Sequence, residues 1–224
     1  MKFKVKAVMI DLDGTLIHTA PEIARAANHM LIALALPLLS ESQVEAYIGE
    51  GAITLINRCL AQQLDGVPDA ALLANAQKLF FDSYAEIVAE SKPYPHAIEA
   101  LQLIQSAGYR LACVTNKPAS FTLPLLEKTN LLQYFDLVVS GDTLQKKKPE
   151  PDQLLYICDK FEIAVNEAVL VGDSKTDITA ARSAGCYVFT VPYGYNQGQR
   201  IEPHAVDALI NNMSEVLDLI DSAH

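Results

Sequence analysis

The chain has 224 residues and a formal net charge of −10 at pH 7, with half of its residues hydrophobic and a fifth charged. This composition is typical of a globular protein and excludes a disordered, fibrous or coiled-coil chain. At roughly 100–200 residues per domain, the length fits one large domain or a core domain with a smaller partner. The acidic balance argues against a sequence-independent nucleic-acid binder, which normally presents a basic face.

The apolar stretches are too short to cross a membrane. The most apolar one, Met30–Leu39, is broken by Pro37, whereas a spanning helix needs about 20 apolar residues. The first residues lack the apolar segment of a signal peptide. Widely spaced cysteines without a metal-binding pattern predict buried, reduced thiols at four positions, Cys59, Cys113, Cys158 and Cys186. We therefore expect a cytoplasmic protein with no membrane partner, and we leave open whether it is a monomer or a homodimer.

The first predicted strand, Val5–Ile10, is followed by a long segment with helical periodicity. From about Leu16 to Ser91 there is no strand candidate, and helices are predicted over Pro21–Leu36, after Ser40, over Ala52–Leu64 and over Asp69–Glu90. Ser40 and Gln43 have the spacing of a capping box. This segment far exceeds the roughly 10–12 residues that a βα crossover needs. We predict an inserted helical cap domain over residues 16–91, hinged near Leu16–Thr19 and Ser91–Pro95.

After this segment, short apolar runs alternate with amphipathic helices. The predicted strands are Leu111–Thr115, Leu137–Ser140, Ala168–Val171 and Tyr187–Val191. The predicted helices are Ala97–Ala107, Ser120–Lys128, Pro151–Phe161 and Thr176–Ala184. Gly108 and Gly185 follow two of these helices as termination signals. The alternation predicts a doubly wound, mainly parallel, Rossmann-like α/β sheet, formed by a core domain of residues 1–15 and 92–224.

Polar residues follow four of the five predicted strands. They occur in four runs, Asp11-Leu12-Asp13-Gly14-Thr15, Thr115-Asn116-Lys117, Lys146–Pro151 and Gly172-Asp173-Ser174-Lys175-Thr176-Asp177. In open α/β sheets, ligands bind beyond the carboxyl ends of the strands. We therefore expect these runs to meet at one edge of the sheet and to form a site.

The expected convergence of Asp11, Asp13, Asp173 and Asp177 needs positive charge nearby. Two like charges ~4 Å apart repel by about 4 kcal/mol at an effective dielectric constant of 20. Carboxylate oxygens without histidine or cysteine suit Mg²⁺, which keeps water molecules for a phosphate. Lys148 is the organic cation that follows the third strand. The residues thus predict a site for a metal ion and an anion.

The position of Asp11 at the end of the first strand suits it to act as a nucleophile, because an aspartyl phosphate divides phosphoryl transfer into two steps. Asp13, two residues later, is placed to protonate the leaving group and then to deprotonate water. Thr115, Asn116 and loop amides are candidates to hold the phosphoryl oxygens, while Mg²⁺ and Lys148 neutralise the developing charge.

These four motifs resemble those of the haloacid dehalogenase superfamily of phosphatases, and the resemblance covers the whole chain, including the helical insertion after the first motif. Within the superfamily, the chain is most similar to the bacterial phosphoglycolate phosphatases. The features that carry this similarity are Ile48-Gly49-Glu50-Gly51 with Arg58, Val114–Pro118, Lys147–Pro151, Gly172–Ser174 and Tyr193–Asn196.

The resemblance implies magnesium-dependent hydrolysis of 2-phosphoglycolate to glycolate and phosphate. It makes Asp11 the nucleophile and a metal ligand, Asp13 the acid/base that gives the metal its backbone carbonyl, and Asp173 the third metal ligand. It also implies that Thr115 and Lys148 hold the phosphoryl group, with Asp177 as a further carboxylate near Lys148. The remaining residues expected to bind substrate are Gly14, Thr15, Asn116, Gly49, Glu50, Gly51 and Arg58.

Two expectations for the cap region rest on different grounds. The residues alone fit a simple connector at Gly49-Glu50-Gly51 as well as a substrate loop, and the resemblance favours the substrate loop. Arg58 could bind a substrate carboxylate in bidentate fashion, but an exposed surface arginine is the more frequent case.

Lys146 and Lys147 belong to a run of charges and are predicted to be solvated.

Other functions fit parts of the pattern. Another phosphatase with a small substrate, a pyrophosphatase or a phosphomutase of the same superfamily would use the same motifs. A receiver-like signalling module also needs Asp, Mg²⁺, Thr and Lys on a parallel sheet. The pair of Asp11 and Asp13 argues against such a module, because the second carboxylate provides a base for dephosphorylation. A binding module without activity remains as a third possibility.

Overall fold

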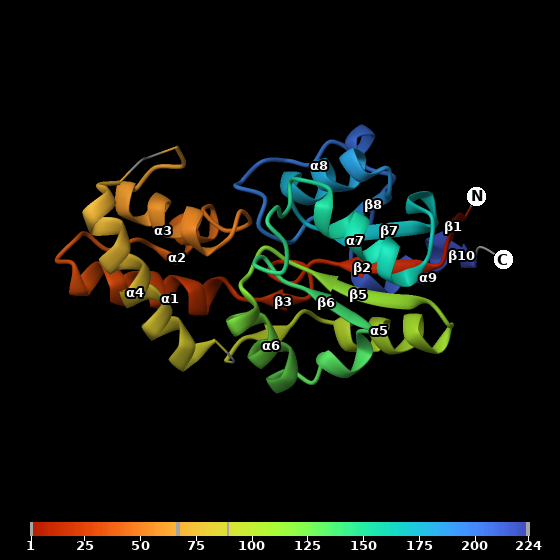
Figure 1. Cartoon of the computed structure of the whole chain (residues 1–224), viewed down its shortest axis with the longest axis horizontal. Coiled ribbons are helices and arrows are strands. Elements are labelled where there is room, and N and C mark those ends of the chain that lie inside the picture. The colour runs from red at the N-terminus through yellow and green to blue at the C-terminus, as the bar shows by residue number, and fades with distance from the viewer. Residues whose placement is uncertain (1, 66–67, 89, 223–224) are drawn as a thin grey trace.

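The computed structural model describes residues 2–65, 68–88 and 90–222. A central sheet with helices on both sides forms one part of the molecule, and a group of helices lies at the other end (Figure 1). Both chain termini lie at the sheet end, far from the helical group (Figure 1). The α/β fold class predicted from the sequence is confirmed.

The main sheet has six strands in the order β6-β5-β2-β7-β8-β9, and all neighbouring strands are parallel. Their bounds are β2 Ala7–Ile10, β5 Arg110–Val114, β6 Leu137–Val139, β7 Ala168–Gly172, β8 Tyr187–Thr190 and β9 Ala208–Leu209. The chain therefore runs outward from β2 to one edge and then from β7 to the other edge. Such a reversal between neighbouring strands opens a crevice at their carboxyl ends, where ligands bind in this type of fold.

The central strands are apolar on both faces because helices cover both. Along β2, Val8 and Ile10 pack into one hydrophobic cluster, whereas Ala7 and Met9 pack into the other. The covering helices are α5 Ala97–Ser106, α6 Ala119–Lys128 and α9 Val216–Leu219 on one face, and α7 Asp152–Phe161 and α8 Lys175–Ala184 on the other (Figure 1). This double burial explains the nearly continuous apolar runs in the sequence.

The helical segment, residues 20–88, contains α1 Ala20–Ala33, α2 Glu41–Glu45, α3 Ala52–Ala61 and α4 Ala70–Ile87. The predicted capping box is present: the Ser40 hydroxyl accepts a hydrogen bond from the Gln43 backbone N–H, and the Gln43 side chain accepts one from the Ser40 N–H. Helix α4 packs along α1. The division of the chain into a core domain and a cap domain remains a prediction.

The prediction that no strand interrupts residues 16–91 is wrong at its start. Ile17–His18 forms β3, which pairs in antiparallel fashion with β4, Lys92–Pro93, on the return path of the chain. Both strands have only two residues, so neither gives a periodic signal in the sequence. They lie in the two segments that we predicted as hinges, and they tie these segments together.

Smaller differences concern the ends of elements. The run predicted as one strand, Val5–Ile10, is divided into β1 Phe3–Val5 and β2, and β1 pairs with β10 Ile220–Ser222 near the C-terminus. Strand β9 was not predicted. The remaining short elements are 3₁₀ turns at Leu132–Tyr134, Val165–Glu167, Pro203–Ala205 and Met213–Glu215. The four cysteines are buried and free, as predicted.

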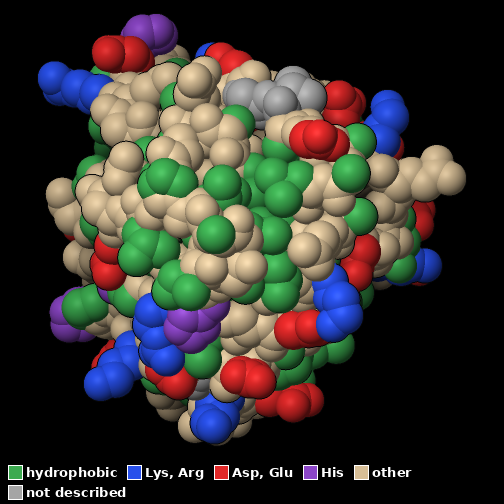
Figure 2. Space-filling view, turned by 90° about the vertical axis from the view of Figure 1, so that its left-hand side faces the viewer, with side chains coloured by type: hydrophobic (Ala, Val, Ile, Leu, Met, Phe, Trp, Pro, Cys, Tyr) green, Lys and Arg blue, Asp and Glu red, His purple; other side chains and the backbone are tan. Residues whose placement is uncertain are grey.

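The outer end of the helical group has a mixed surface. Hydrophobic side chains lie in the middle of this face, and acidic and basic side chains lie mainly towards its lower part and rim (Figure 2). The large hydrophobic side chains that the segment exposes include Ile32, Leu38 and Leu64. Within the described residues, no helix is both long and apolar enough to cross a lipid bilayer.

Candidate active site

The candidate site lies at the carboxyl ends of β2 and β7, where the direction of the chain across the sheet reverses. Asp11 directly follows β2, and Asp173 directly follows β7. The Asp11 backbone N–H donates to the Val171 carbonyl at 2.9 Å, so the pairing of the two strands extends to the first acidic residue. The sequence patterns that end both strands therefore meet at the crevice expected for this sheet order.

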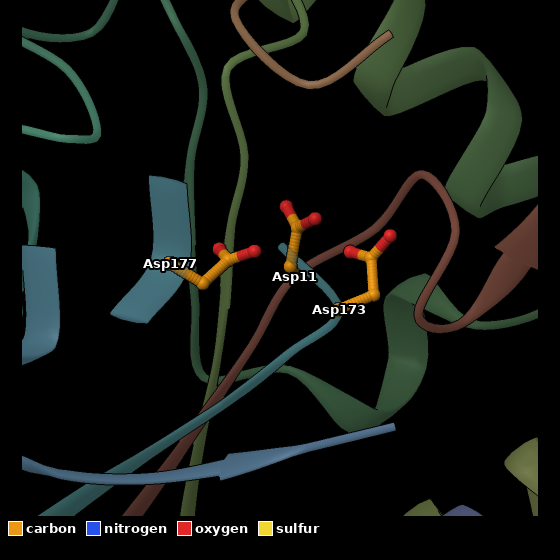
Figure 3. A group of neighbouring side chains, drawn as sticks. All are labelled: Asp11, Asp173 and Asp177. Carbon is orange, nitrogen blue, oxygen red and sulfur yellow. The ribbon is translucent and has the colours of Figure 1, made fainter. Parts of the chain in front are cut away.

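Three carboxylates gather at this crevice. One oxygen each of Asp11, Asp173 and Asp177 lies within 4.8 Å of the others. Asp11 lies between the other two, and the side chains of Asp173 and Asp177 reach towards it from opposite sides (Figure 3). Asp177 comes from the first turn of α8, whereas the other two residues follow strands. The predicted convergence of Asp11, Asp173 and Asp177 is thus seen in the structure.

Lys148 supplies the positive charge at the centre of this cluster. Its Nζ atom lies 2.7 Å from Asp11 Oδ1 and 2.7 Å from Asp177 Oδ1, and it donates to the Val114 carbonyl at 2.8 Å. The side chain is only 2% exposed. Its three N–H donors are therefore all used, and the ammonium group fixes the direction of the Asp11 carboxylate.

Gln153, which the sequence analysis did not single out, holds the loop that carries Lys148. Its Oε1 accepts from the Lys148 N–H at 3.0 Å, and its Nε2 donates to the carbonyls of Thr115 and Ser140. This one buried amide therefore joins the ends of β5 and β6 to the lysine loop.

Burial and charge shift the proton equilibria of the cluster. Burial is the largest cause that raises the pKa of Asp11 to about 7, with Lys148 acting in the opposite sense and the negative charge of Asp177 adding to the rise. Burial and the Asp11 charge also raise the pKa of Asp173. For Lys148, burial opposes the charged form, but Asp11 and Asp177 raise the pKa above its usual value. One ammonium group therefore only partly compensates the carboxylates.

Asp173 is held by the two loops on either side of it. Its Oδ1 accepts from the Thr15 hydroxyl at 3.0 Å, and its Oδ2 accepts from the Tyr195 backbone N–H. A Cβ atom at Gly14, where φ is +87°, would overlap Asp173 Oδ2. Thr15 and Gly14, which we expected to bind substrate, thus shape the position of Asp173. Tyr195 was missed as a site residue, although its run was noted in the sequence.

Asp13 does not join the carboxylate cluster. Its Oδ1 accepts a hydrogen bond from Lys117 Nζ at 2.9 Å, and both side chains are largely buried. The same Nζ lies 4.8 Å from the centre of the Tyr84 ring in α4. Lys117 was part of the quoted Thr115-Asn116-Lys117 run but received no role. Its place two residues after Thr115, on the same strand end, was the signal available in the sequence.

Asp177 is fixed from two sides. Its Oδ2 accepts from the Ser174 hydroxyl at 2.6 Å, while its Oδ1 accepts from Lys148. Ser174 and Asp177 together form the capping box of α8. The helix terminus therefore sets the position of this carboxylate relative to Asp11, in agreement with its expected place beside Lys148.

A cavity of about 50 Å³ extends from Asp11 and Asp13 towards the helical segment. Thr115, Asn116 and Lys117 line it from the sheet side. Its other walls come mostly from the helical segment and α6, with Ile23, Ile48, Gly49, Gly51, Ala52, Leu55, Phe80, Tyr84, Pro118 and Phe121. The space suits a small molecule, because one water molecule needs roughly 10–15 Å³ on this scale.

The loop at Gly49–Gly51 contacts residues of the α/β part of the molecule. Asn116 Nδ2 donates to the Gly49 carbonyl at 3.0 Å and to the Lys148 carbonyl at 2.7 Å. Gln197 Nε2 donates to Glu50 Oε1 at 3.1 Å. Lys147 is half-buried beside Gly51, so the prediction that it is solvated is wrong. The helical segment is therefore in contact with the residues around the candidate site.

The expectation that Arg58 is exposed is also wrong. Arg58 is 6% exposed, and it donates to the carbonyls of Leu64 and Tyr47 and to the Glu50 carboxylate. It is not among the described residues that line the cavity. All three guanidinium nitrogens are used inside the helical segment, where they hold the loop that carries Glu50.

Comparison with known families identifies the chain. A family model described as haloacid dehalogenase-like hydrolase matches residues 8–191, which is more than half of the sequence. The chain belongs to the haloacid dehalogenase-like hydrolase family. The resemblance seen in the strand-end motifs is thereby confirmed, and the receiver-like alternative is set aside.

Relatives within this hydrolase family match over nearly the full length. A phosphoglycolate phosphatase of Nitrosospira multiformis is 48% identical over 220 residues, which cover 98% of this chain and 97% of the relative. One of Thiobacillus denitrificans is 44% identical with the same coverage. The crystal structure of a predicted phosphoglycolate phosphatase from Haemophilus somnus has a TM-score of 0.89 and 33% identity, covering 96% of this chain and 97% of that chain.

A further solved structure shares the fold alone. The crystal structure of CbbY from Rhodobacter sphaeroides in complex with phosphate has a TM-score of 0.79 and 24% identity, and it covers 95% of this chain and 96% of that chain. The overall fold is thus shared with this structure.

Glu22, in the first turn of α1, is a buried acid outside the site. It is 3% exposed, and neither of its carboxylate oxygens makes a well-aligned hydrogen bond to a described residue. Burial is the main cause that raises its pKa, although Ser91 and Lys117 favour the charged form. A folded chain that binds this proton more tightly than the unfolded chain loses stability as pH rises through the raised pKa.

We therefore expect Glu22→Gln to stabilise the protein by about 1 kcal/mol at pH 8 and to have little effect at pH 4.5. Urea unfolding curves of both proteins over this pH range measure the difference. Glu86→Gln, on the exposed side of α4, is the matched control. It should not change the free energy of unfolding at either pH. A Glu22→Gln protein that is less stable than wild type at pH 8 would contradict the expectation.

Proposed function

We propose that this protein is a magnesium-dependent phosphatase that hydrolyses 2-phosphoglycolate through an aspartyl-phosphate intermediate. The observation that carries the proposal is the Asp11 carboxylate at the end of β2, with one oxygen held by Lys148 at 2.7 Å. Its other oxygen makes no hydrogen bond within the described residues, so it is available to attack phosphorus. The substrate follows from the relatives named phosphoglycolate phosphatase, which are up to 48% identical over nearly the whole chain.

In the first step, an Asp11 oxygen forms a bond to phosphorus, and the bond between phosphorus and the glycolate oxygen breaks. Asp13 gives a proton to that leaving oxygen. In the second step, Asp13 takes a proton from water, the water oxygen attacks phosphorus, and the bond to Asp11 breaks to release phosphate. Lys117 lies 2.9 Å from Asp13 and orients this acid/base.

The phosphoryl oxygens need donors that stay in place during both steps. Thr115 and Asn116 line the cavity beside Asp11, and Gln153 holds the Thr115 backbone. Lys148 is fixed by its three hydrogen bonds and places positive charge next to the nucleophile. Donors held in advance stabilise charge that develops in the transition state without reorganising.

Mg²⁺ fits this set of donors. Three carboxylates within 4.8 Å of one another, without a histidine or cysteine, form an all-oxygen group that one lysine only partly neutralises. Asp11 and Asp173 would hold the ion together with the backbone carbonyl of Asp13, while Asp177 remains bound to Lys148. The ion would supply charge neutralisation for the phosphoryl oxygens.

The helical segment is proposed to act as a cap over the site, with β3 and β4 as its hinge. Its loop at Gly49–Gly51 meets Asn116 and Gln197 on the sheet side, so the helical segment lies against the site in this arrangement. Closure of this kind excludes water from the phosphoryl group before the hydrolytic step.

A phosphate-release assay tests the function. We expect 2-phosphoglycolate to give the highest kcat/KM in a panel that includes sugar phosphates, pyrophosphate and other small phosphomonoesters. A chelator should remove the activity, and added Mg²⁺ should restore it. A higher kcat/KM for another substrate would assign the chain a different phosphatase activity, and full activity with the chelator would contradict the role of the metal.

A further inference from the structure

The side chain of Lys117 lines the cavity beside Asp11. The hydrolytic steps do not use all of its N–H donors. Among the described residues that line the cavity, only Lys117 has a cationic side chain. Its ammonium group has three N–H donors; one is directed to Asp13, and a second is directed to the oxygen of the Tyr84 hydroxyl. One donor therefore remains for a ligand in the cavity.

The Tyr84 hydroxyl is a second unused donor in the same cavity. Tyr84 is 2% exposed and lines the cavity, and no described residue accepts a hydrogen bond from its hydroxyl. Its ring stacks on Phe80, with centroids 5.6 Å apart, and meets the edge of Phe121 at 5.0 Å. The ring is therefore fixed, and the hydroxyl is held close to the Lys117 ammonium, which lies over the same ring.

A buried hydroxyl and a buried ammonium with free donors call for an acceptor with negative charge. Apart from Asp11 and Asp13, which the reaction uses, the described residues that line the cavity carry no negative charge, and many are apolar, such as Ile23, Leu55 and Phe80. An anion in such an apolar space needs a cation and a hydrogen-bond donor. Arg58, the residue that the sequence suggested for a substrate carboxylate, is occupied inside the helical segment.

We propose that Lys117 and Tyr84 form an anion subsite that recognises the carboxylate of the substrate. This inference rests on the proposed function, which supplies a phosphoester with a carboxylate one carbon away from the ester oxygen. So short a substrate keeps its carboxylate near Asp13, and Lys117 is in contact with Asp13. Because Tyr84 comes from the helical segment and Lys117 from the sheet side, the subsite is complete only when the two parts meet. It therefore selects small phosphoesters with a second anionic group.

The test compares two substrates in two variants. 2-Hydroxyethyl phosphate has the same carbon skeleton as 2-phosphoglycolate, with a hydroxymethyl group in place of the carboxylate. We expect Lys117→Met to lower the ratio of kcat/KM for 2-phosphoglycolate to that for 2-hydroxyethyl phosphate by about 10- to 100-fold. Tyr84→Phe, which keeps the ring, should lower the same ratio by about three- to tenfold. Most of the loss with 2-phosphoglycolate should appear in KM.

The ratio separates carboxylate recognition from the contact between Lys117 and Asp13, because a disturbed Asp13 slows both substrates equally. Lys146→Met, an exposed lysine outside the cavity, is the control and should leave the ratio unchanged. An unchanged ratio in Tyr84→Phe and Lys117→Met overturns the subsite, and Tyr84→Phe alone decides if the lysine variant does not fold. Wild-type protein that releases no phosphate from 2-phosphoglycolate overturns the proposed function as well.

Discussion

Asp11→Asn should abolish phosphate release, with a loss of at least about 10⁴-fold in kcat, because the amide cannot form the acyl phosphate through which both steps pass. The substitution keeps the shape of the side chain. Lys148 keeps its 2.7 Å contact with Asp177, so no buried ammonium is left without a partner. Steady-state phosphate release and the stoichiometry of phosphate bound to the protein measure the effect.

The same variant should remain folded. Burial raises the pKa of Asp11 to about 7, so the folded chain favours the neutral carboxyl, and its stability falls as pH rises from the unfolded value towards 7 and is lowest above it. Asparagine removes this dependence. We expect a melting temperature at pH 8 that is no lower than that of wild type. A variant that is folded and still active would refute covalent catalysis by Asp11.

Lys148→Met should cost both activity and stability. The substitution leaves Asp11 and Asp177 without the ammonium group that each contacts at 2.7 Å. Removing one partner from a buried ion pair costs about 3–5 kcal/mol, and turnover should fall below detection because the nucleophile loses its orientation. Urea unfolding and phosphate release on the same preparation measure the two effects.

The stability loss in Lys148→Met should depend on pH. Without the ammonium group, the main opposition to the burial that raises the pKa of Asp11 is gone, so the folded state binds this proton more tightly than the unfolded chain does. The loss is therefore greatest at pH 8 and shrinks as pH falls towards 5. Lys146→Met, which removes an exposed lysine two residues away, should show no loss. An equal loss of stability at all pH values would indicate that the lost packing of the lysine side chain, and not its lost charge, destabilises the variant.

The parts of the fold that the sequence predicted well are those with strong apolar patterns. Strands such as β5 and β7 are buried on both faces, so they appear as continuous apolar runs, and the helix ends at Gly108 and Gly185 have the positive φ that favours glycine. Strands β3, β4 and β9 have two residues each. These strands form only because they pair with strands that are distant in the sequence. A local sequence pattern cannot predict such pairing.

The site shows the same division. The carboxylates of Asp11 and Asp173 were predictable because both follow apolar strands, and the topology brings such ends together. The burial of Arg58 was not, because it depends on carbonyls at Tyr47 and Leu64 that the fold of the helical segment brings to it. The same holds for the pairing of Asp13 with Lys117, which lies 104 positions further along the chain.

The ladder between β3 and β4 brings the two ends of the helical segment together. The chain leaves the sheet framework at His18 and returns opposite it at Lys92, so the helical segment begins and ends at neighbouring points of the backbone. An insert that begins and ends at one point can be exchanged for another without moving any strand that carries the phosphoryl-transfer groups. Swapping residues 19–91 between relatives should therefore transfer substrate preference while the chemistry stays with the recipient.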